Sequence, residues 1–167
     1  MASVSKRIMA WSKCAIEIGK TGSGDAMGTS LTSIGTIKDK SSSLEASEGD
    51  VLEAKATGGE IIAKEPQEGG FTLTTRVIEP TDDLLTMLGL GETSSDEFQI
   101  KTHLVEDYWS VKVTPQNIGA RGIKAPKCNV SYKPGWSEEE GNYADLTFEI
   151  LHGDANYWYS IFTNSAV

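Results

Sequence analysis

Side chains that could catalyse a reaction near neutral pH are few in this sequence. It has two histidines, His103 and His152, and histidine is the residue whose ordinary pKa lies nearest to neutrality. His103 falls on the polar side of an alternating segment and His152 in a Gly-Asp turn, so surface positions without a catalytic role are expected. No Gly-x-Ser-x-Gly motif is present to indicate a hydrolase triad. We therefore predict no catalytic residues and no enzyme.

Paired carboxylates are the second group that could do chemistry. Asp82 and Asp83 follow Thr81 and precede a short leucine-rich run, a position where negative charge stabilises a helix N-terminus. Residues 138–140 are three glutamates, which are expected to form a solvated acidic loop. Because glycosidase carboxylates cannot be recognised from spacing, helix capping and solvation are the simpler interpretations.

Neither a metal nor a cofactor is predicted. Cys14 and Cys128 lie far apart, match no metal-ligand spacing and are expected to be free thiols. The glycine-rich segment 19–30 contains Gly-Lys-Thr and Gly-x-Gly. However, Cys14 stands where a phosphate loop has its first glycine, and Met27 where a dinucleotide fingerprint has its third.

The length and charge of the chain favour one acidic globular domain, residues 1–167. Its 24 acidic and 15 basic residues give a net charge of −9, which disfavours nucleic-acid binding. No apolar run is long enough to span a bilayer, and no signal-peptide core follows Lys6 and Arg7. We expect no signal peptide, no membrane partner, a cytoplasmic product and a flexible N-terminal arm at 1–12.

The elements of the fold are clearest in residues 69–89. Phe71, Leu73, Thr75 and Val77 alternate with more polar residues, which predicts a half-buried strand ended by a proline. The following turn predicts a short α-helix at about 81–88, with a threonine cap and a final glycine.

Other alternating segments predict further short strands with frequent turns. Within 43–57 a helix and a hairpin over 48–50 explain the residues equally well, and the hairpin is preferred. Segments 115–126 and 136–141 are predicted to be irregular. The remaining strands are predicted at 13–19, 31–38, 60–65, 98–104, 108–114, 127–133, 143–151 and 157–163. This pattern predicts an all-β, antiparallel sandwich or barrel with one short flanking α-helix.

The stretch 69–89 also carries a resemblance to a known family. Its order is a glycine-rich turn, a threonine-rich strand, Glu-Pro, an acidic cap and a Leu-Leu-x-x-Leu-Gly helix. This order resembles the tail tube proteins, or major tail proteins, of long-tailed bacteriophages and prophages. The resemblance extends more loosely to the segment 43–65 and to the strand around 144–149.

The resemblance implies a structural protein of the virion, assembled in the bacterial cytoplasm, that forms homohexameric rings stacked into a hollow tail tube. DNA would pass through without specific binding, and other tail proteins, such as the tape measure and terminator, would be partners. The loops 20–30 and 38–57 would contact neighbouring subunits.

Two alternatives remain open. One is the related inner tube of a type VI secretion or other contractile injection system. The other is a carbohydrate-binding β-sandwich module, because such modules bind sugars through exposed rings. For Tyr157, Trp158 and Tyr159, core packing or a subunit contact is preferred to a sugar platform.

Overall fold

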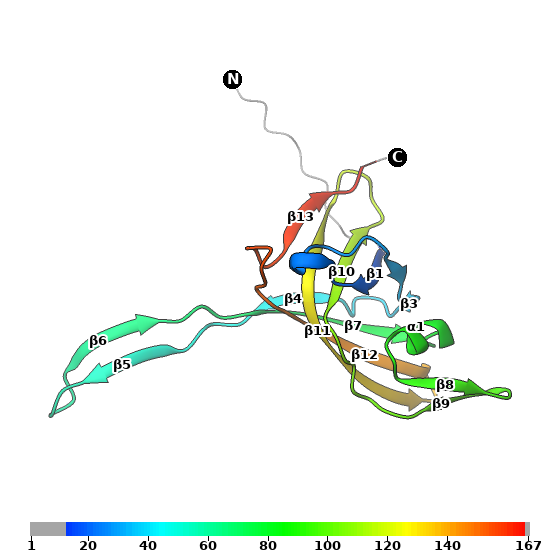
Figure 1. Ribbon diagram of the computed structural model, residues 1–167, viewed down its shortest axis with the longest axis horizontal. Helices are drawn as coiled ribbons and strands as arrows, with labels where there is room; N and C mark the ends of the chain where they lie inside the picture. Colours follow the sequence, from blue (N-terminus) through cyan, green and yellow to red (C-terminus); the bar gives the residue numbers. More distant parts are fainter. Residues whose placement is uncertain (1–12, 166–167) are drawn as a thin grey trace, which may run out of the picture.

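Nine antiparallel strands of the protein form one bent sheet, and two further pairs form separate hairpins (Figure 1). The structure, a computed structural model, describes residues 13–165. The flexible N-terminal arm predicted at 1–12 therefore lies outside the described residues. The strand order of the main sheet is β2-β1-β10-β11-β12-β7-β3, with β13 beside β11 and β4 beside β7. The elements are β1 (Cys14–Lys20), a 3-10 turn (Ser23–Asp25), β2 (Thr32–Ser33), β3 (Thr36–Ile37), β4 (Ser43–Ala46), β5 (Val51–Lys55), β6 (Ile61–Pro66), β7 (Phe71–Ile78), α1 (Asp82–Met87), β8 (Gly91–Ser94), β9 (Glu97–Ile100), β10 (Trp109–Pro115), β11 (Arg121–Ser137), β12 (Gly141–Ile150) and β13 (Ser160–Thr163).

The long strand β11 joins two groups of strands. Its first part pairs with β10 on one side and β13 on the other, and its second part pairs with β12. Alternate residues of both groups point to a shared core, with Ile16, Val111, Leu146 and Phe148 almost completely buried. The prediction of a mainly antiparallel β fold with one short helix is confirmed, and the described strands do not close into a barrel.

The stretch 69–89 folds as predicted. Leu73, Thr75 and Val77 on β7 are buried. The hydroxyl of Thr81 accepts a hydrogen bond from the amide of Leu84 at the start of α1, which satisfies one of the unpaired donors of a helix N-terminus. After the helix, Gly89 adopts a φ of 73°, the left-handed conformation that glycine adopts without steric cost.

The hairpin predicted over residues 48–50 is wrong. Strand β4 pairs with β7 and strand β5 with β6, so the chain runs straight through this segment and turns at Gly58-Gly59. Both of these glycines have positive φ, 98° and 90°, which residues 48–50 do not have. Residues 43–78 therefore form one long hairpin, whose outer part we call the arm, residues 47–69.

Several other boundaries also differ from the predictions. Gly35, with a φ of 101°, divides the strand predicted at 31–38 into β2 and β3. Segment 91–100 forms the hairpin of β8 and β9, although only a strand at 98–104 was predicted in this region. The terminal strand β13 covers only the second half of segment 157–163.

Strand β11 continues through segments predicted to be irregular, at 121–126 and at 136–137. Pro126 is accommodated where the pairing with β10 changes register, so no amide is required there, and its carbonyl accepts a hydrogen bond from Ser110. At Pro134, β11 pairs with β12 on one side, and its other edge has no partner strand among the described residues. A proline, which has no backbone N–H to donate, is therefore tolerated there.

Candidate functional site

The residues that could do chemistry do not gather into one site. His103 and His152 are both exposed, and the His152 ring packs against Trp158 with a centroid distance of 5.2 Å. Asp82 and Asp83 lie exposed in the first turn of α1. Within residues 13–165 no three His, Cys, Asp or Glu side chains lie close enough to hold a metal ion, and no helix there is long and apolar enough to cross a membrane.

The two cysteines are free thiols in different surroundings. Cys128 is buried in the core, and burial raises the pKa of its thiol to about 12, which leaves it protonated and unreactive. Cys14 on β1 is only partly buried and is therefore accessible from solvent.

The glycine-rich loop after β1 is fastened to the body of the protein. The hydroxyl of Thr21 donates to the carbonyl of Pro126 at 2.8 Å, and the amide of Gly28 donates to the hydroxyl of Ser110 at 2.9 Å. The carboxylate of Asp25 accepts from the amide of Asp154 and from the Lys127 ammonium. The Asp154 amide is the main reason why the pKa of Asp25 is lowered, followed by Lys127. These contacts tie the loop down as a structural element.

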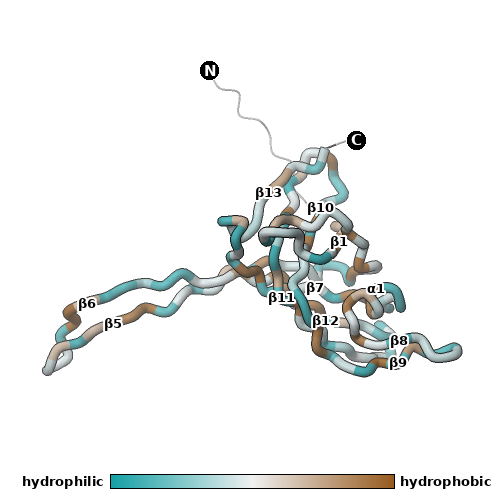
Figure 2. Tube along the Cα trace, in the orientation of Figure 1, coloured by the Kyte–Doolittle hydropathy of each residue, from teal (hydrophilic) through white to brown (hydrophobic). Residues whose placement is uncertain are grey.

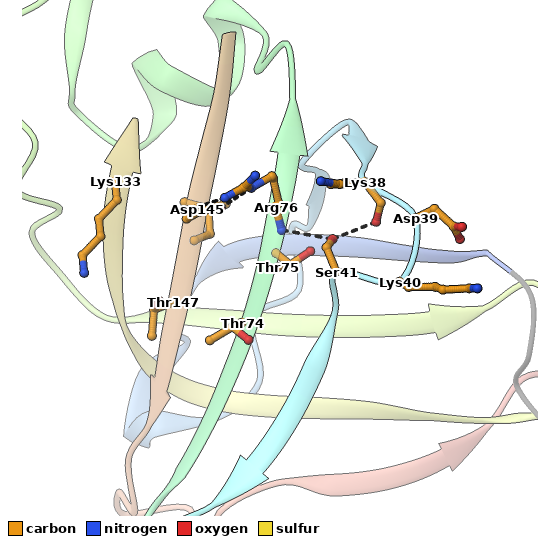
Figure 3. A pocket seen from close by; sticks show the side chains of 11 residues that line it. Lys38, Asp39, Lys40, Ser41, Thr74, Thr75, Arg76, Lys133, Asp145 and Thr147 are labelled. Atoms are coloured by element: carbon orange, nitrogen blue, oxygen red, sulfur yellow. Dashed lines mark hydrogen bonds and ion pairs between the residues drawn. The ribbon is translucent and has the colours of Figure 1, made fainter. Parts of the chain in front are cut away.

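Strands β4, β7, β12 and β11 turn a polar face away from the core. In register, Ser43, Thr74, Thr147 and Ser131 form one row of hydroxyls across the four strands. The next row along β7, β12 and β11 consists of Arg76, Asp145 and Lys133. Figure 3 shows Thr74 and Thr147 on neighbouring strands beside this charged row. We call the face that these two rows form the polar sheet face.

An ion-pair network holds one end of the polar sheet face. The guanidinium of Arg76 donates to both oxygens of Asp145, at 2.6 and 3.0 Å, and to Glu140 at 3.1 Å. Glu140 also accepts from Lys38, and that bond is the main cause of its lowered pKa. A hollow of about 500 Å³ lies beside the network (Figure 3). Its arginine is paired with two carboxylates, whereas Lys40 and Lys133, which also line it, form no ion pair within 4 Å among the described residues.

The arm, residues 47–69, is the most unusual feature of the surface. All eleven residues of β5 and β6 are exposed, and the hairpin extends away from the rest of the protein (Figure 1). Four of them are large and aliphatic (Val51, Leu52, Ile61 and Ile62), with exposed fractions between 46% and 67%. Figure 2 shows apolar residues on β5 and, on β6, near the tip of the hairpin. A two-stranded ribbon without a core is marginally stable by itself, and exposed apolar side chains of this kind are typical of interaction surfaces.

The base of the arm is held firmly. A Cβ atom at Gly49 would collide with the carbonyl of Gln67, and one at Gly69 with that of Ser47, so the two strands cross at very short range. The indole of Trp158 donates to Glu68 at 3.1 Å, and its ring packs edge-on against Phe71, which Tyr159 also contacts. The packing role preferred for these C-terminal aromatic residues is therefore confirmed for Trp158 and Tyr159.

The arm was only partly recognisable in the sequence. The glycine pair at 58–59 marks a turn in the sequence, but the continuity of the strands on both sides of it was not predicted. The available signal was the nearly symmetrical placement of Gly49 and Gly69 around that turn, with aliphatic residues between them.

Comparison of the sequence with protein-family models found no match, and neither did comparison with curated proteins. The family resemblance of the stretch 69–89 therefore stays a prediction.

Proposed function

We propose that this chain is a structural subunit that assembles with copies of itself into stacked rings, forming the hollow tail tube of a bacteriophage. The proposal combines the resemblance of residues 69–89 to tail tube proteins with the surface of the fold. Its architecture is a β-sandwich-like fold with one short helix, the architecture that the resemblance implies.

The exposed arm is the observation that carries the proposal. Fully burying a valine, leucine or isoleucine side chain contributes about 1.5–3 kcal/mol. Since about half of each of its four aliphatic side chains is exposed, covering them would contribute about 3–6 kcal/mol. A monomer gains none of this free energy, whereas a subunit in a polymer does.

The polar sheet face supports a lining role in such a tube. Its hydroxyl row has no charge, and the cation of Arg76 is paired with carboxylates. In these two rows this leaves Lys133 as the cation without an ion pair among the described residues, so the face offers few contacts to a phosphate backbone. The net charge of −9 acts in the same direction by repelling DNA. DNA would therefore pass without specific binding. The inner tube of a contractile injection system would use the same assembly.

The proposal is tested by measuring the mass of the purified chain against its concentration, using size-exclusion chromatography with light scattering. In a matched variant, an Asn-Gly turn replaces residues 51–66. This turn suits a two-residue hairpin, and Asp50 and Gln67 already form a closing hydrogen bond at 2.7 Å. We expect the full chain to form large assemblies and the variant to stay monomeric with an unchanged melting temperature. A full chain that is monomeric throughout would contradict the proposal.

A further inference from the structure

We propose that the arm of one subunit binds in a groove on a second copy of the chain, between the start of β1 and the loop that joins β3 to β4. This inference rests on the proposed function and assigns the surface that receives the arm.

The groove is a strip of the hydrophobic core that residues 13–165 leave uncovered. It has a volume of about 740 Å³ and lies where the β1–β10 group of strands faces the β3, β4 and β7 group. Its floor contains Ile37, Leu44, Val113 and Ile123. Residues 13–165 bury each of these side chains only partly. Three of these, Ile37, Leu44 and Val113, pack against the main core, so the groove opens onto apolar atoms.

The rim of the groove is basic, although the chain as a whole is acidic. Four cations line it, Lys13, Lys38, Lys40 and Arg121, together with one carboxylate, Asp39. Only Lys38 forms an ion pair within 4 Å among the described residues, with Glu140. The other three cations are therefore available for carboxylates from another molecule.

The arm carries the complementary chemistry. Residues 47–69 contain six carboxylates and two lysines, a net charge of −4, together with the four aliphatic side chains. Apolar residues would lie on the floor of the groove while carboxylates meet its rim, the pairing of charges that favours and orients association. Residues 1–12 contain Lys6, Arg7 and no acidic residue, so their charge does not complement that of the rim.

The occupant is expected to be the arm of another copy. Each side of the arm has about ten residues, so its tip extends about 30 Å from its base. The crossing at Gly49 and Gly69 fixes its direction, which points away from β3 and hence from the groove of the same chain (Figure 1). An arm that leaves one subunit and enters a groove on the next makes a head-to-tail contact, the kind that closes rings or builds tubes.

A natural cysteine allows a direct test. Cys14 lines the groove and is accessible, whereas Cys128, the other cysteine, is buried. A second thiol would be placed on the arm by Leu52→Cys or Ile62→Cys, and in a control on the β8–β9 hairpin by Ile100→Cys. All three side chains are exposed, so the fold should tolerate the changes. Assembled protein would be treated with a short bis-maleimide cross-linker.

At least one arm variant should give covalent dimers and higher multimers on a denaturing gel, and Cys14→Ser should abolish them. The Ile100→Cys control should give none. Independently, Cys14 of the assembled wild-type chain should be alkylated at least about tenfold more slowly than Cys14 of the variant with residues 51–66 replaced.

Two outcomes overturn the inference while leaving the proposed function intact: assemblies in which Cys14 reacts freely and forms no cross-link to the arm, or a cross-link confined to one chain. Absence of any assembly would overturn both.

Discussion

Replacing Ile61 on the arm by threonine should weaken assembly without weakening the fold. Ile61 is 50% exposed, so burial against a partner would add about half of the 1.5–3 kcal/mol of a full isoleucine, or about 0.8–1.5 kcal/mol. Threonine keeps the β-branched shape that suits a strand but loses most of this gain. The critical concentration for assembly should therefore rise about 4–12-fold, since about 1.4 kcal/mol corresponds to a factor of ten.

The assay is light scattering or sedimentation over a concentration series, with thermal unfolding measured on the same samples. Ile100→Thr is the matched control, because Ile100 is 48% exposed and lies in the other two-stranded hairpin. The melting temperatures of both variants should stay close to that of the wild type. Equal effects of the two substitutions on assembly, or a clear loss of stability from Ile61→Thr alone, would refute the assignment of the arm as the contact surface.

Three further predictions concern the fold. Lys38, and then Arg76, lower the pKa of Glu140 in the native state below its ordinary value of 4.5. Its ionised carboxylate therefore stabilises the native state fully at pH values above 4.5. This stabilisation is lost as the pH falls through the lowered pKa of the native state. In Glu140→Gln the melting temperature should therefore fall less between neutral pH and about pH 3, and an unchanged pH profile would contradict this role. Thr81→Ala should cost about 0.5–2 kcal/mol in urea unfolding through loss of the helix cap, and no measurable change would argue against the cap. Leu84→Ala should cost about 2–5 kcal/mol because the side chain is 2% exposed in the core, and a cost below about 1 kcal/mol would mean that α1 is not part of the core.

The sequence predicts the fold best where every local signal agrees. Along β7 and α1 the alternation, the proline, the threonine cap and Gly89 all indicate the same boundaries, and the structure follows them. The overall class follows from the same kind of signal, because alternating segments with frequent turns favour antiparallel β structure.

The prediction fails where long-range pairing decides the outcome. Residues 48–50 have the composition of a turn, but β4 extends along β7 and carries the chain past them into the arm. Pro126 and Pro134 signal breaks, yet neighbouring strands hold β11 together through both. The basic groove was also not predicted, because Lys13, Lys40 and Arg121 are brought together only by the folded sheet.

Self-assembly through the arm is tested most directly by electron microscopy of the concentrated chain beside the variant with residues 51–66 replaced by an Asn-Gly turn. We expect rings or tubes with a central channel for the full chain, and dispersed monomers for the variant. Dispersed monomers in both samples, or the same tubes in both, would contradict it.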